Sequence, residues 1–489
     1  MCAQLSVAER KAQGADAAAR IPLQAHRGWE PATGRRSPVT VLREQEADRL
    51  PDLVPVRHGR MLVSPFTFYR GAAAVMAEDL RATPVASLRV QLCGDAHLSN
   101  FGAFGSPERR LVFDVNDFDE TLPGPFEFDV KRMVTSFVIA ARDNGFSPAE
   151  QKAVARRAAA AYRTAMAEFA GLSTMDVWYA SLDEDKIRAA VRHTLDDLGQ
   201  AEKAAKNGKE RKRAHERAKA ARKAAKRAAR NVAKAHTRDS TQALSKLGEV
   251  KDGRYQIVSQ PPVVMPLRAL APDELPEMTA EQIDQLIRDQ FAAYRATLEP
   301  DRRHLLEQFE IVDAARKVVG VGSVGTRAYI VLLQGRDTRD PLFLQIKEAT
   351  SSVLEGYLPR SRYRQHGQRV VQGQRLMQAA SDIYLGWTRG PRGRHFYWRQ
   401  LRDMKGSAVI EGMSPVALGE YAWLCGWTLA RAHARSGDPV AIAAYLGEGD
   451  TFDRAMTDFA VRYADQNERD YAEFAAAVKS GELEALPGV

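Results

Sequence analysis

The sequence is poor in the residues that build disulfide frameworks and membrane spans. Its three cysteines, Cys2, Cys93 and Cys425, are far apart and form no C-x-x-C pair. This argues against a disulfide scaffold or a zinc site and fits a reducing compartment. The chain has no run of about 18 apolar residues, and residues 1–24 are polar, without a secretory apolar core. We therefore expect a cytoplasmic protein without a membrane span.

The motif G-x-x-x-x-G-K-[ST] is also absent, which disfavours a P-loop nucleotide-binding protein. A chain of 489 residues with 45% hydrophobic residues is nevertheless large and apolar enough for two or three domains with a substantial core.

Acidic and amide side chains are concentrated between Val90 and Glu120. An apolar run leads into G-D-A-H-L-S-N-F-G, and a second run, L-V-F, leads into D-V-N-D-F-D-E. The pattern predicts a strand, a tight loop, a hairpin turn and a strand. Carboxylates and an amide gathered where strands end suit a divalent cation, most often Mg²⁺ on phosphates. The alternative is a polar loop whose Asp and Asn side chains satisfy turn backbone groups.

A second pattern, G-x-G-x-x-G, runs from Gly320 to Gly325. A dinucleotide-binding loop would open a helix, but here an apolar strand over 327–333 follows, then a polar turn and a third strand that carries Lys347 near its end. Glycines let backbone amides approach phosphates, and a lysine on a strand pairs with them, as in a kinase nucleotide lobe. The alternative is a glycine-rich hairpin with a lysine exposed on an edge strand.

The loop G-D-A-H-L-S-N resembles the catalytic loop of the protein-kinase-like fold as aminoglycoside and choline phosphotransferases carry it. Cys93 stands where those enzymes usually have His, and N-D-F-D-E resembles their D-F-G or I-D-F segment. The whole chain is similar to a bacterial family catalogued as domain of unknown function 2252. The matching blocks lie between residues 60 and 405 and are R-M-L-V-S-P-F-T-F-Y-R-G-A, G-D-A-H-L-S-N-F-G, N-D-F-D-E-T-L-P-G-P-F-E-F-D-V-K-R, L-Q-I-K-E-A and R-Q-L-R-D-M-K-G.

The resemblance implies an ATP- and Mg²⁺-dependent enzyme that transfers a phosphoryl or nucleotidyl group to a hydroxyl acceptor, expected to be a small molecule. Asp95 would orient or deprotonate the acceptor, and His97 would order the loop or make a core hydrogen bond. The helix expected over 363–384 has no clear Glu partner for the lysine. The implied metal ligands are Asn100 and Asp117, with Asp114 competing, and the implied nucleotide-binding residues are Gly320, Gly322, Ser323, Gly325 and Lys347.

Asp95 precedes Lys347 in this chain, whereas ordinary kinases have the glycine loop and lysine first. We therefore predict an α+β, protein-kinase-like two-lobed fold that is circularly permuted, with the catalytic-loop lobe first and the nucleotide lobe second. The expected parts are an N-terminal arm (1–60), a helical lobe with the catalytic and metal loop (61–198), a basic helical insertion and linker (199–260), a β-rich nucleotide-binding lobe (261–410) and C-terminal helices of the large lobe (411–489).

Residues 201–234 hold fourteen Lys and Arg against three Glu, a net +11, while the whole chain carries +9. This segment should form a long solvated helix or helical hairpin without an apolar stripe and with little tertiary anchorage. It is either a solvated insertion or a weak polyanion-binding handle, and without aromatics it does not support base contact. Two other functions stay open: a nucleotide-binding pseudo-enzyme, and a nucleic-acid-associated protein acting through this segment.

Local signals predict several other elements. Pro123-Gly124-Pro125 should break the chain, and residues 21–60 should be largely extended. The expected helices cover 7–20, 65–80 with Ser64 as N-cap, 127–144, 149–171, 279–298 with Thr279 and Gln282 as a capping box, 415–433, and the amphipathic segment 440–489.

Overall fold

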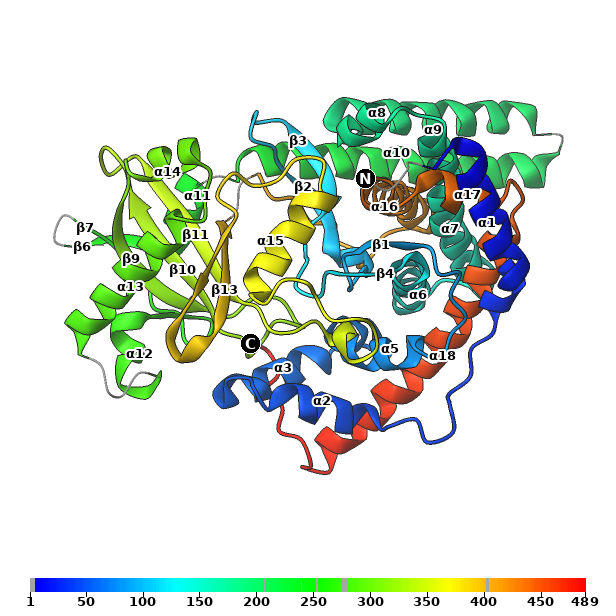
Figure 1. Ribbon diagram of the computed structural model, residues 1–489. Coiled ribbons are helices and arrows are strands. Elements are labelled where there is room, and N and C mark those ends of the chain that lie inside the picture. Colours follow the sequence, from blue (N-terminus) through cyan, green and yellow to red (C-terminus); the bar gives the residue numbers. More distant parts are fainter. Residues whose placement is uncertain (1–4, 206, 239, 252–253, 275–278, 402–403) are drawn as a thin grey trace.

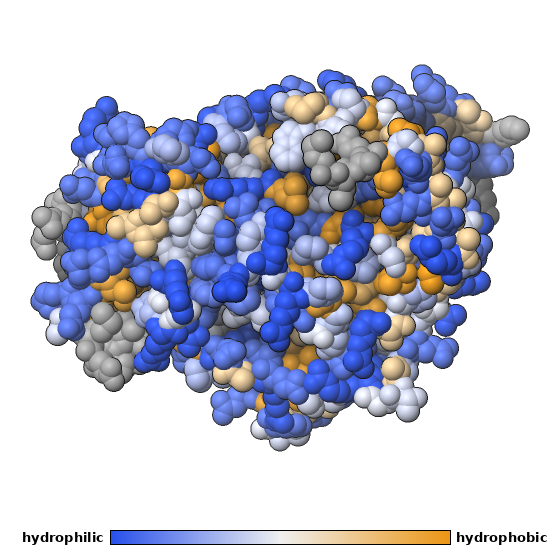
Figure 2. All heavy atoms as spheres, in the orientation of Figure 1, coloured by the Kyte–Doolittle hydropathy of each residue, from blue (hydrophilic) through white to orange (hydrophobic). Residues whose placement is uncertain are grey.

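A mixed α+β arrangement is seen in the computed structural model, which describes residues 5–489 except 206, 239, 252–253, 275–278 and 402–403. A six-stranded sheet lies at one end of the molecule and most of the long helices lie at the other (Figure 1). Most of the surface in view is hydrophilic, with hydrophobic residues in small patches (Figure 2). None of the described helices is long and apolar enough to cross a membrane.

The six-stranded sheet is antiparallel throughout and has the order β12-β13-β11-β10-β9-β8. Helices cover the sheet. Tyr294 of α13 (Ala280–Arg295) stacks on Trp398 of the sheet at 4.5 Å, and α15 (His366–Met377) lies against β12 and β13. The predicted order of strand, glycine loop, strand, turn and lysine-bearing strand is confirmed. The strands are β8 (Val264–Pro266), β9 (Glu310–Lys317), β10 (Ala328–Gln334), β11 (Pro341–Glu348), β12 (Gly386–Arg389) and β13 (His395–Gln400).

Three smaller sheets complete the strands. The segment read as a chain break, Pro123-Gly124-Pro125, instead lies in a strand that pairs with β1. Proline is tolerated there because β4 pairs on one side only in a two-stranded sheet. The strands are β1 (Arg89–Leu92), β2 (Phe101–Gly105), β3 (Leu111–Val115), β4 (Leu122–Pro125), β5 (Leu182–Asp183), β6 (Gly248–Lys251) and β7 (Arg254–Ile257), with the pairings β1-β4, β2-β3-β5 and β6-β7.

Helices built from capped, amphipathic segments surround an almost wholly buried α6, which packs against α7 and α18. The helices expected over 7–20, 127–144 and 149–171 are confirmed to within one residue. Those expected over 279–298 and 415–433 are confirmed with C-terminal ends that differ by three residues. The segment 363–384 is helical only over 366–377, and 440–489 contains two helices in place of one. The helices are α1 (Val7–Arg20), α2 (Pro38–Glu46), α3 (Val54–Met61), α4 (Pro65–Gly71), α5 (Ala73–Leu80), α6 (Phe126–Asp143), α7 (Pro148–Ala170), α8 (Thr174–Tyr179), α9 (Glu184–Ala204), α10 (Gly208–His236), α11 (Ser240–Leu247), α12 (Leu267–Glu274), α13 (Ala280–Arg295), α14 (Pro300–Leu306), α15 (His366–Met377), α16 (Pro415–Ser436), α17 (Pro439–Leu446) and α18 (Thr451–Lys479).

Two expectations about the N-terminal part were wrong. Residues 38–61 are not extended but form α2 and α3, because Ser37 caps α2 and α2 packs against α18. The helix expected over 65–80 is two helices, α4 and α5, separated at Ala72, where the backbone leaves helical geometry. The predicted capping by Ser64 is confirmed.

The basic segment forms an antiparallel pair, α9 and α10, as expected for a helical hairpin. The expectation that α10 has no stripe and little anchorage was wrong. Alanines at helical spacing, including Ala214, Ala218 and Ala221, are partly or fully buried, and α10 contacts both α9 and α16. Alanine gives a stripe too weak in hydropathy to stand out in so charged a sequence, yet it lets helices approach closely.

Candidate functional site

The loop after β1 is held in place by helix α6. The backbone N–H groups of Cys93 and Gly94 donate to the Asp129 carboxylate at 2.8 and 3.0 Å. Gly94 has a positive φ of 86°, and a Cβ there would lie 2.2 Å from the Glu120 carbonyl oxygen. Glycine is therefore required for the close approach between this loop and the segment after β3.

The Asp95 carboxylate is oriented by a buried arginine. Arg132 Nε donates to Asp95 Oδ1 at 2.8 Å, and the Asn100 side-chain amide donates to the Asp95 carbonyl oxygen at 2.7 Å. His97 is buried, with Nε2 3.7 Å from Asp95 Oδ2. Burial and the nearby Arg70 and Arg132 charges hold the pKa of His97 well below its usual value and favour the neutral imidazole. Its Nδ1 has no hydrogen-bond partner among the described residues.

The segment after β3 meets Lys347 of β11. Lys347 Nζ donates to Asp119 Oδ2 at 2.5 Å and lies 3.9 Å from Asp117 Oδ2, while the Tyr397 hydroxyl donates to Asp119 Oδ1 at 2.6 Å. Only 2% of the Lys347 side chain is exposed. Burial opposes the ammonium charge, but Asp117 and Asp119 outweigh it and raise the pKa of Lys347.

The pKa values of Asp117 and Asp119 are shifted in opposite directions. Burial, followed by the neighbouring Asp119 charge, raises the pKa of Asp117. Burial also opposes ionisation of Asp119, but Lys347 and the Tyr397 hydrogen bond outweigh it and lower the pKa of Asp119. Asp119 is therefore the fixed counter-ion of the lysine, and Asp117 is the carboxylate left to face the cavity.

A cavity of about 590 Å³ lies between the six-stranded sheet and the loops after β1 and β3. It brings together five predicted residues, and its wall is strongly cationic, with six Lys or Arg side chains against two carboxylates. Asp95, His97, Gly322 and Gly325 are not part of this wall. The predicted residues that line it are Asn100, Asp117, Gly320, Ser323 and Lys347.

The glycine loop between β9 and β10 is folded down toward the aspartates. Gly320 and Gly325 have positive φ values of 68° and 88°, which glycine adopts at little cost. Ser323 Oγ lies 3.4 Å from Asp119 Oδ2, and Arg60 donates to the Gly320 carbonyl oxygen at 2.5 Å. The loop is thus fixed both to the acidic segment and to helix α3.

Asp114 lies outside this arrangement. It is 1% exposed and forms an ion pair with the equally buried Arg431, and the Ala379 N–H donates to its carboxylate at 2.8 Å. Both carboxylate oxygens are occupied by partners within the core. The geometry therefore favours Asp117 over Asp114 as the ligand of a cation in the cavity.

Helix α15, the helix in which the sequence shows no clear Glu partner for Lys347, carries a buried arginine near its start. Arg369 is buried and donates to the carbonyl oxygens of Thr121, Asp119 and Thr350 at 2.7, 2.8 and 2.8 Å. Glu355, which precedes α15, lies 3.8 Å from Arg369 Nε and not against Lys347. The carboxylate that pairs with Lys347 is that of Asp119.

Sequence reasoning missed Arg132, Arg369, Tyr397 and Arg399 as site residues. The signal for the last two was present, because Tyr397 and Arg399 are two positions apart in the alternating segment H-F-Y-W-R-Q and so share one face of a strand. Arg399 lines the cavity and donates to the Gln345 side chain at 2.9 Å. Arg132 is 37 positions from Asp95 in the chain, and only the fold shows that the two residues are partners.

Among the described residues no three carboxylate, imidazole or thiol groups converge as a preformed metal cage. A protein-bound Mg²⁺ that also holds phosphates generally takes only one or two carboxylates from the protein. Asn100 and Asp117 both lie on the cavity wall. Their amide and carboxylate oxygens match the small number of protein ligands that such a Mg²⁺ takes.

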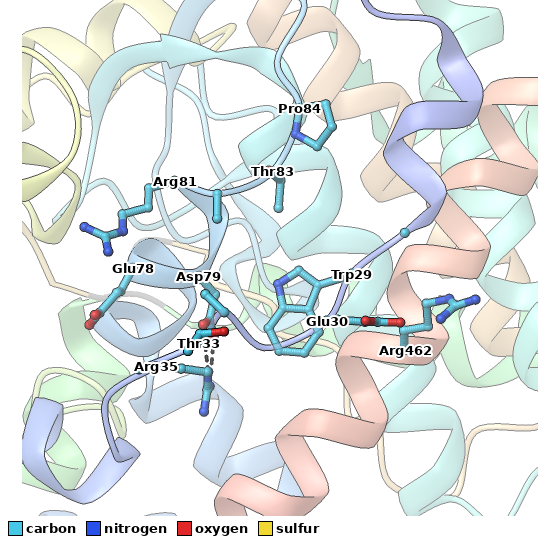
Figure 3. Close-up of a pocket in the computed structure, with 14 residues that line it drawn as sticks. Trp29, Glu30, Thr33, Arg35, Glu78, Asp79, Arg81, Thr83, Pro84 and Arg462 are labelled. Atoms are coloured by element: carbon cyan, nitrogen blue, oxygen red, sulfur yellow. Dashed lines mark hydrogen bonds and ion pairs between the residues drawn. The ribbon is translucent and has the colours of Figure 1, made fainter.

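Two further cavities contain none of the predicted site residues. One, of about 430 Å³, lies beside α5 and α18 and is shown in Figure 3. There Arg35 pairs with Asp79 at 2.7 Å and with Asp470 at 2.6 Å, so its central arginine is already held by two carboxylates. The other, of about 790 Å³, is mainly apolar and lies on the face of the six-stranded sheet that bears Trp398 and Ile346.

A family model described as "Uncharacterized protein conserved in bacteria", domain of unknown function 2252, matches residues 49–230 and 215–477. The chain belongs to this family. The match spans all the blocks that carry Asp95, Asp117 and Lys347, so the site described above lies within the family's region. Comparison with curated proteins and with solved structures gives no match.

Proposed function

We propose that this family member is an ATP- and Mg²⁺-dependent, kinase-like phosphotransferase with a circularly permuted order of lobes. The observation that carries the proposal is the convergence of Asn100, Asp117, Ser323 and Lys347 on one cationic cavity, from segments more than 200 positions apart. A cationic cavity with few carboxylates attracts phosphates. One strand-borne lysine with two acidic neighbours is the pattern expected for a bound nucleotide and its metal ion.

The order of elements supports the same proposal. A glycine hairpin (β9 and β10) leads to the lysine strand β11, then to α15, and then to β12 and β13, which is the order expected for a kinase nucleotide lobe. The helices that carry the Asp95 loop come earlier in the chain, and α16–α18 return to pack against them. This return is what a circular permutation would require.

In the proposed reaction the Lys347 ammonium holds nucleotide phosphates, and the backbone of the glycine loop covers them. Asn100 and Asp117 would hold Mg²⁺, which neutralises developing charge on the phosphates when bound. Asp95, fixed by Arg132, orients an acceptor hydroxyl and takes its proton. His97 stays neutral and keeps the loop in shape. Asp119 and Tyr397 hold the lysine in its place.

A nucleotide-binding pseudo-enzyme is the second candidate. It is favoured by Cys93 at the position where related catalytic loops have His, and by the absence of Asp95 from the cavity wall. Mass spectrometry of small molecules and proteins incubated with ATP and Mg²⁺ separates the two candidates. A phosphorylated or nucleotidylated product supports the enzyme, and nucleotide binding without any product supports the pseudo-enzyme.

Isothermal titration with ATP and Mg²⁺ tests nucleotide binding. The wild type should bind, Lys347→Met should weaken binding about tenfold or more, equivalent to ~1.4 kcal/mol, and Asp117→Ala should remove the Mg²⁺ dependence. Arg339→Gln is the matched control, because this exposed arginine lies in the β10–β11 turn. Absent binding in the wild type, or equal effects of Lys347→Met and Arg339→Gln, would reject the proposal.

A further inference from the structure

Helix α10 presents an exposed face of unpaired cations. Ten described Lys and Arg side chains on it are exposed, and none of these ten forms an ion pair with another described residue. They are Arg211, Lys212, Arg217, Lys219, Arg222, Lys223, Lys226, Arg227, Arg230 and Lys234. These like charges on one helix repel one another. A bound polyanion would reduce this electrostatic repulsion.

The alanine stripe of α10 fixes the direction in which these cations point. Ala218 and Ala221 are buried, and the helix packs on α9 and α16 through this side. At 3.6 residues per turn, most of the long cationic side chains, including those of Lys223, Arg227 and Arg230, lie on the side away from this contact. From Arg211 to Lys234 the array extends over about 35 Å of this 29-residue helix, at 1.5 Å per residue.

The C-terminal end of α10 lies at the mouth of the cavity. Ala235 packs with Leu111 and Met404 in one small apolar cluster, and the Met404 N–H donates to the Arg238 carbonyl oxygen at 2.7 Å. The next residue, Lys405, lines the cavity. The cations of α10 thus run up to the cavity wall, where the cationic residues are Arg70, Arg109, Lys317, Lys347, Arg399 and Lys405.

We infer that α10 and the rim of the cavity form one continuous binding surface for a phosphate-backbone polyanion, with one end of the polymer at the cavity. Residues 201–234 contain no aromatic side chain, so bases would not be stacked and binding should be independent of sequence. Phosphate contacts from Lys and Arg account for such binding by releasing counterions. A single strand of nucleic acid and inorganic polyphosphate share this backbone chemistry.

This inference also names the class of acceptor, which rests on the proposed phosphotransfer. A nucleic-acid strand ends in a hydroxyl, whereas inorganic polyphosphate ends in phosphate. In the transfer, the terminal hydroxyl oxygen would bond to the γ-phosphorus of ATP, the bond from that phosphorus to the ADP oxygen would break, and the hydroxyl proton would pass to Asp95. The acceptor would then be a polymer end in place of the small molecule expected from the sequence.

Binding is tested by fluorescence anisotropy on the full chain without ATP, with a labelled single-stranded oligonucleotide of about 20 nucleotides, long enough to span α10 at ~3.4 Å per phosphate. Unlabelled polyphosphate and poly-glutamate serve as competitors. The wild type should bind with a steep salt dependence. The variant Lys223→Gln/Arg227→Gln/Arg230→Gln should lose on the order of 100-fold in affinity near 0.1 M salt, with a shallower salt slope by about two, from ~0.7 per lost phosphate contact.

The control variant is Arg302→Gln/Arg336→Gln/Arg339→Gln, which removes the same number of positive charges, two from exposed residues in the β10–β11 turn and one from a half-buried residue of α14. It should leave both affinity and slope unchanged. Equal losses in both variants, or no binding by the wild type, would overturn the inference. Competition by poly-glutamate as effective as by polyphosphate would show an acidic-polypeptide surface and would also overturn it.

The position of the polymer end is tested with a photo-crosslinker at the 3′ or 5′ terminus of the oligonucleotide. Cross-links to the β2–β3 turn or to the peptide containing Lys405 are expected, and cross-links confined to the far end of α10 would contradict the continuous surface. Transfer of labelled phosphate from ATP to the oligonucleotide is measured separately. Binding and cross-linking without transfer would reject the acceptor role and leave the binding surface, so the two failures are distinguishable.

Discussion

Lys347 Nζ lies 2.5 Å from Asp119 Oδ2, although 228 positions separate the two residues in the chain. The pair joins the β11 strand to the segment after β3. With the Tyr397 hydroxyl on the other oxygen of Asp119, it fixes the lysine at the edge of the cavity.

Asp119→Asn should destabilise the protein by about 2–3 kcal/mol, because it leaves the buried Lys347 ammonium with only the more distant Asp117 as a counter-charge. Asp119 is partly exposed, so the loss should be below that of a fully buried pair. Urea unfolding at neutral pH measures it. Tyr397→Phe removes one hydrogen bond and keeps the ring, so it should cost only about 1 kcal/mol. If Asp119→Asn lowers the free energy of unfolding by no more than Tyr397→Phe does, Asp119 is not the main counter-ion of Lys347.

Asp114 and Asp117 should separate stability from binding. Asp114→Asn breaks an ion pair with Arg431 in which both side chains are 1% exposed, and should cost about 3–5 kcal/mol. Asp117→Asn should change unfolding by less than about 1 kcal/mol, because burial and Asp119 already disfavour its charge. Only Asp117→Asn should keep the fold and lose Mg²⁺-dependent ATP binding. The reverse pattern would make Asp114 the metal ligand.

Glu120 should make stability fall with rising pH. Burial raises the pKa of Glu120 to about 7, above the ordinary 4.5. Between these two values the folded protein binds more protons than the unfolded chain, so stability declines as pH rises through that window. Glu120→Gln keeps an acceptor for the Val353 N–H and should stabilise by about 1–3 kcal/mol at pH 8 and by little at pH 5. Thermal unfolding at both pH values checks this, and an equal effect at both would contradict it.

Gly94 should not tolerate a side chain. In Gly94→Ala the Cβ would meet the Glu120 carbonyl oxygen at 2.2 Å in a backbone with positive φ, so a loss well above about 2 kcal/mol is expected, or failure to fold. Gly145→Ala is the matched control, since Gly145 also has positive φ but open space around it, and should cost only about 1 kcal/mol of backbone strain. Yield and unfolding midpoint compare the two, and similar losses would show that the contact with Glu120 is unimportant.

The local parts of the fold could be predicted from the sequence. Capping residues such as Ser64, Ser147 and Thr279 mark helix starts that the structure bears out. Alternation and turn residues gave the strands around the glycine loop. The N-terminal arm and the alanine side of α10 were misread, because their order comes from packing against α18, α9 and α16, and a single segment carries no sign of its distant partner.

The site was predictable in its residues but not in its pairings. The acidic loop, the glycine loop and Lys347 stood out by composition and spacing, and the structure brings most of them to one cavity. That Lys347 pairs with Asp119, that Arg132 holds Asp95 and that Arg431 occupies Asp114 depends on which elements become neighbours. No rule of spacing connects residues 37 to 317 positions apart.

The most direct test of the central claim is a crystal structure with a non-hydrolysable ATP analogue and Mn²⁺ in place of Mg²⁺, with the metal located by its anomalous scattering. The account predicts the metal beside Asn100 and Asp117, phosphates against Lys347, and the glycine loop over them. A nucleotide bound in either of the other two cavities, or a metal held by Asp114, would contradict it.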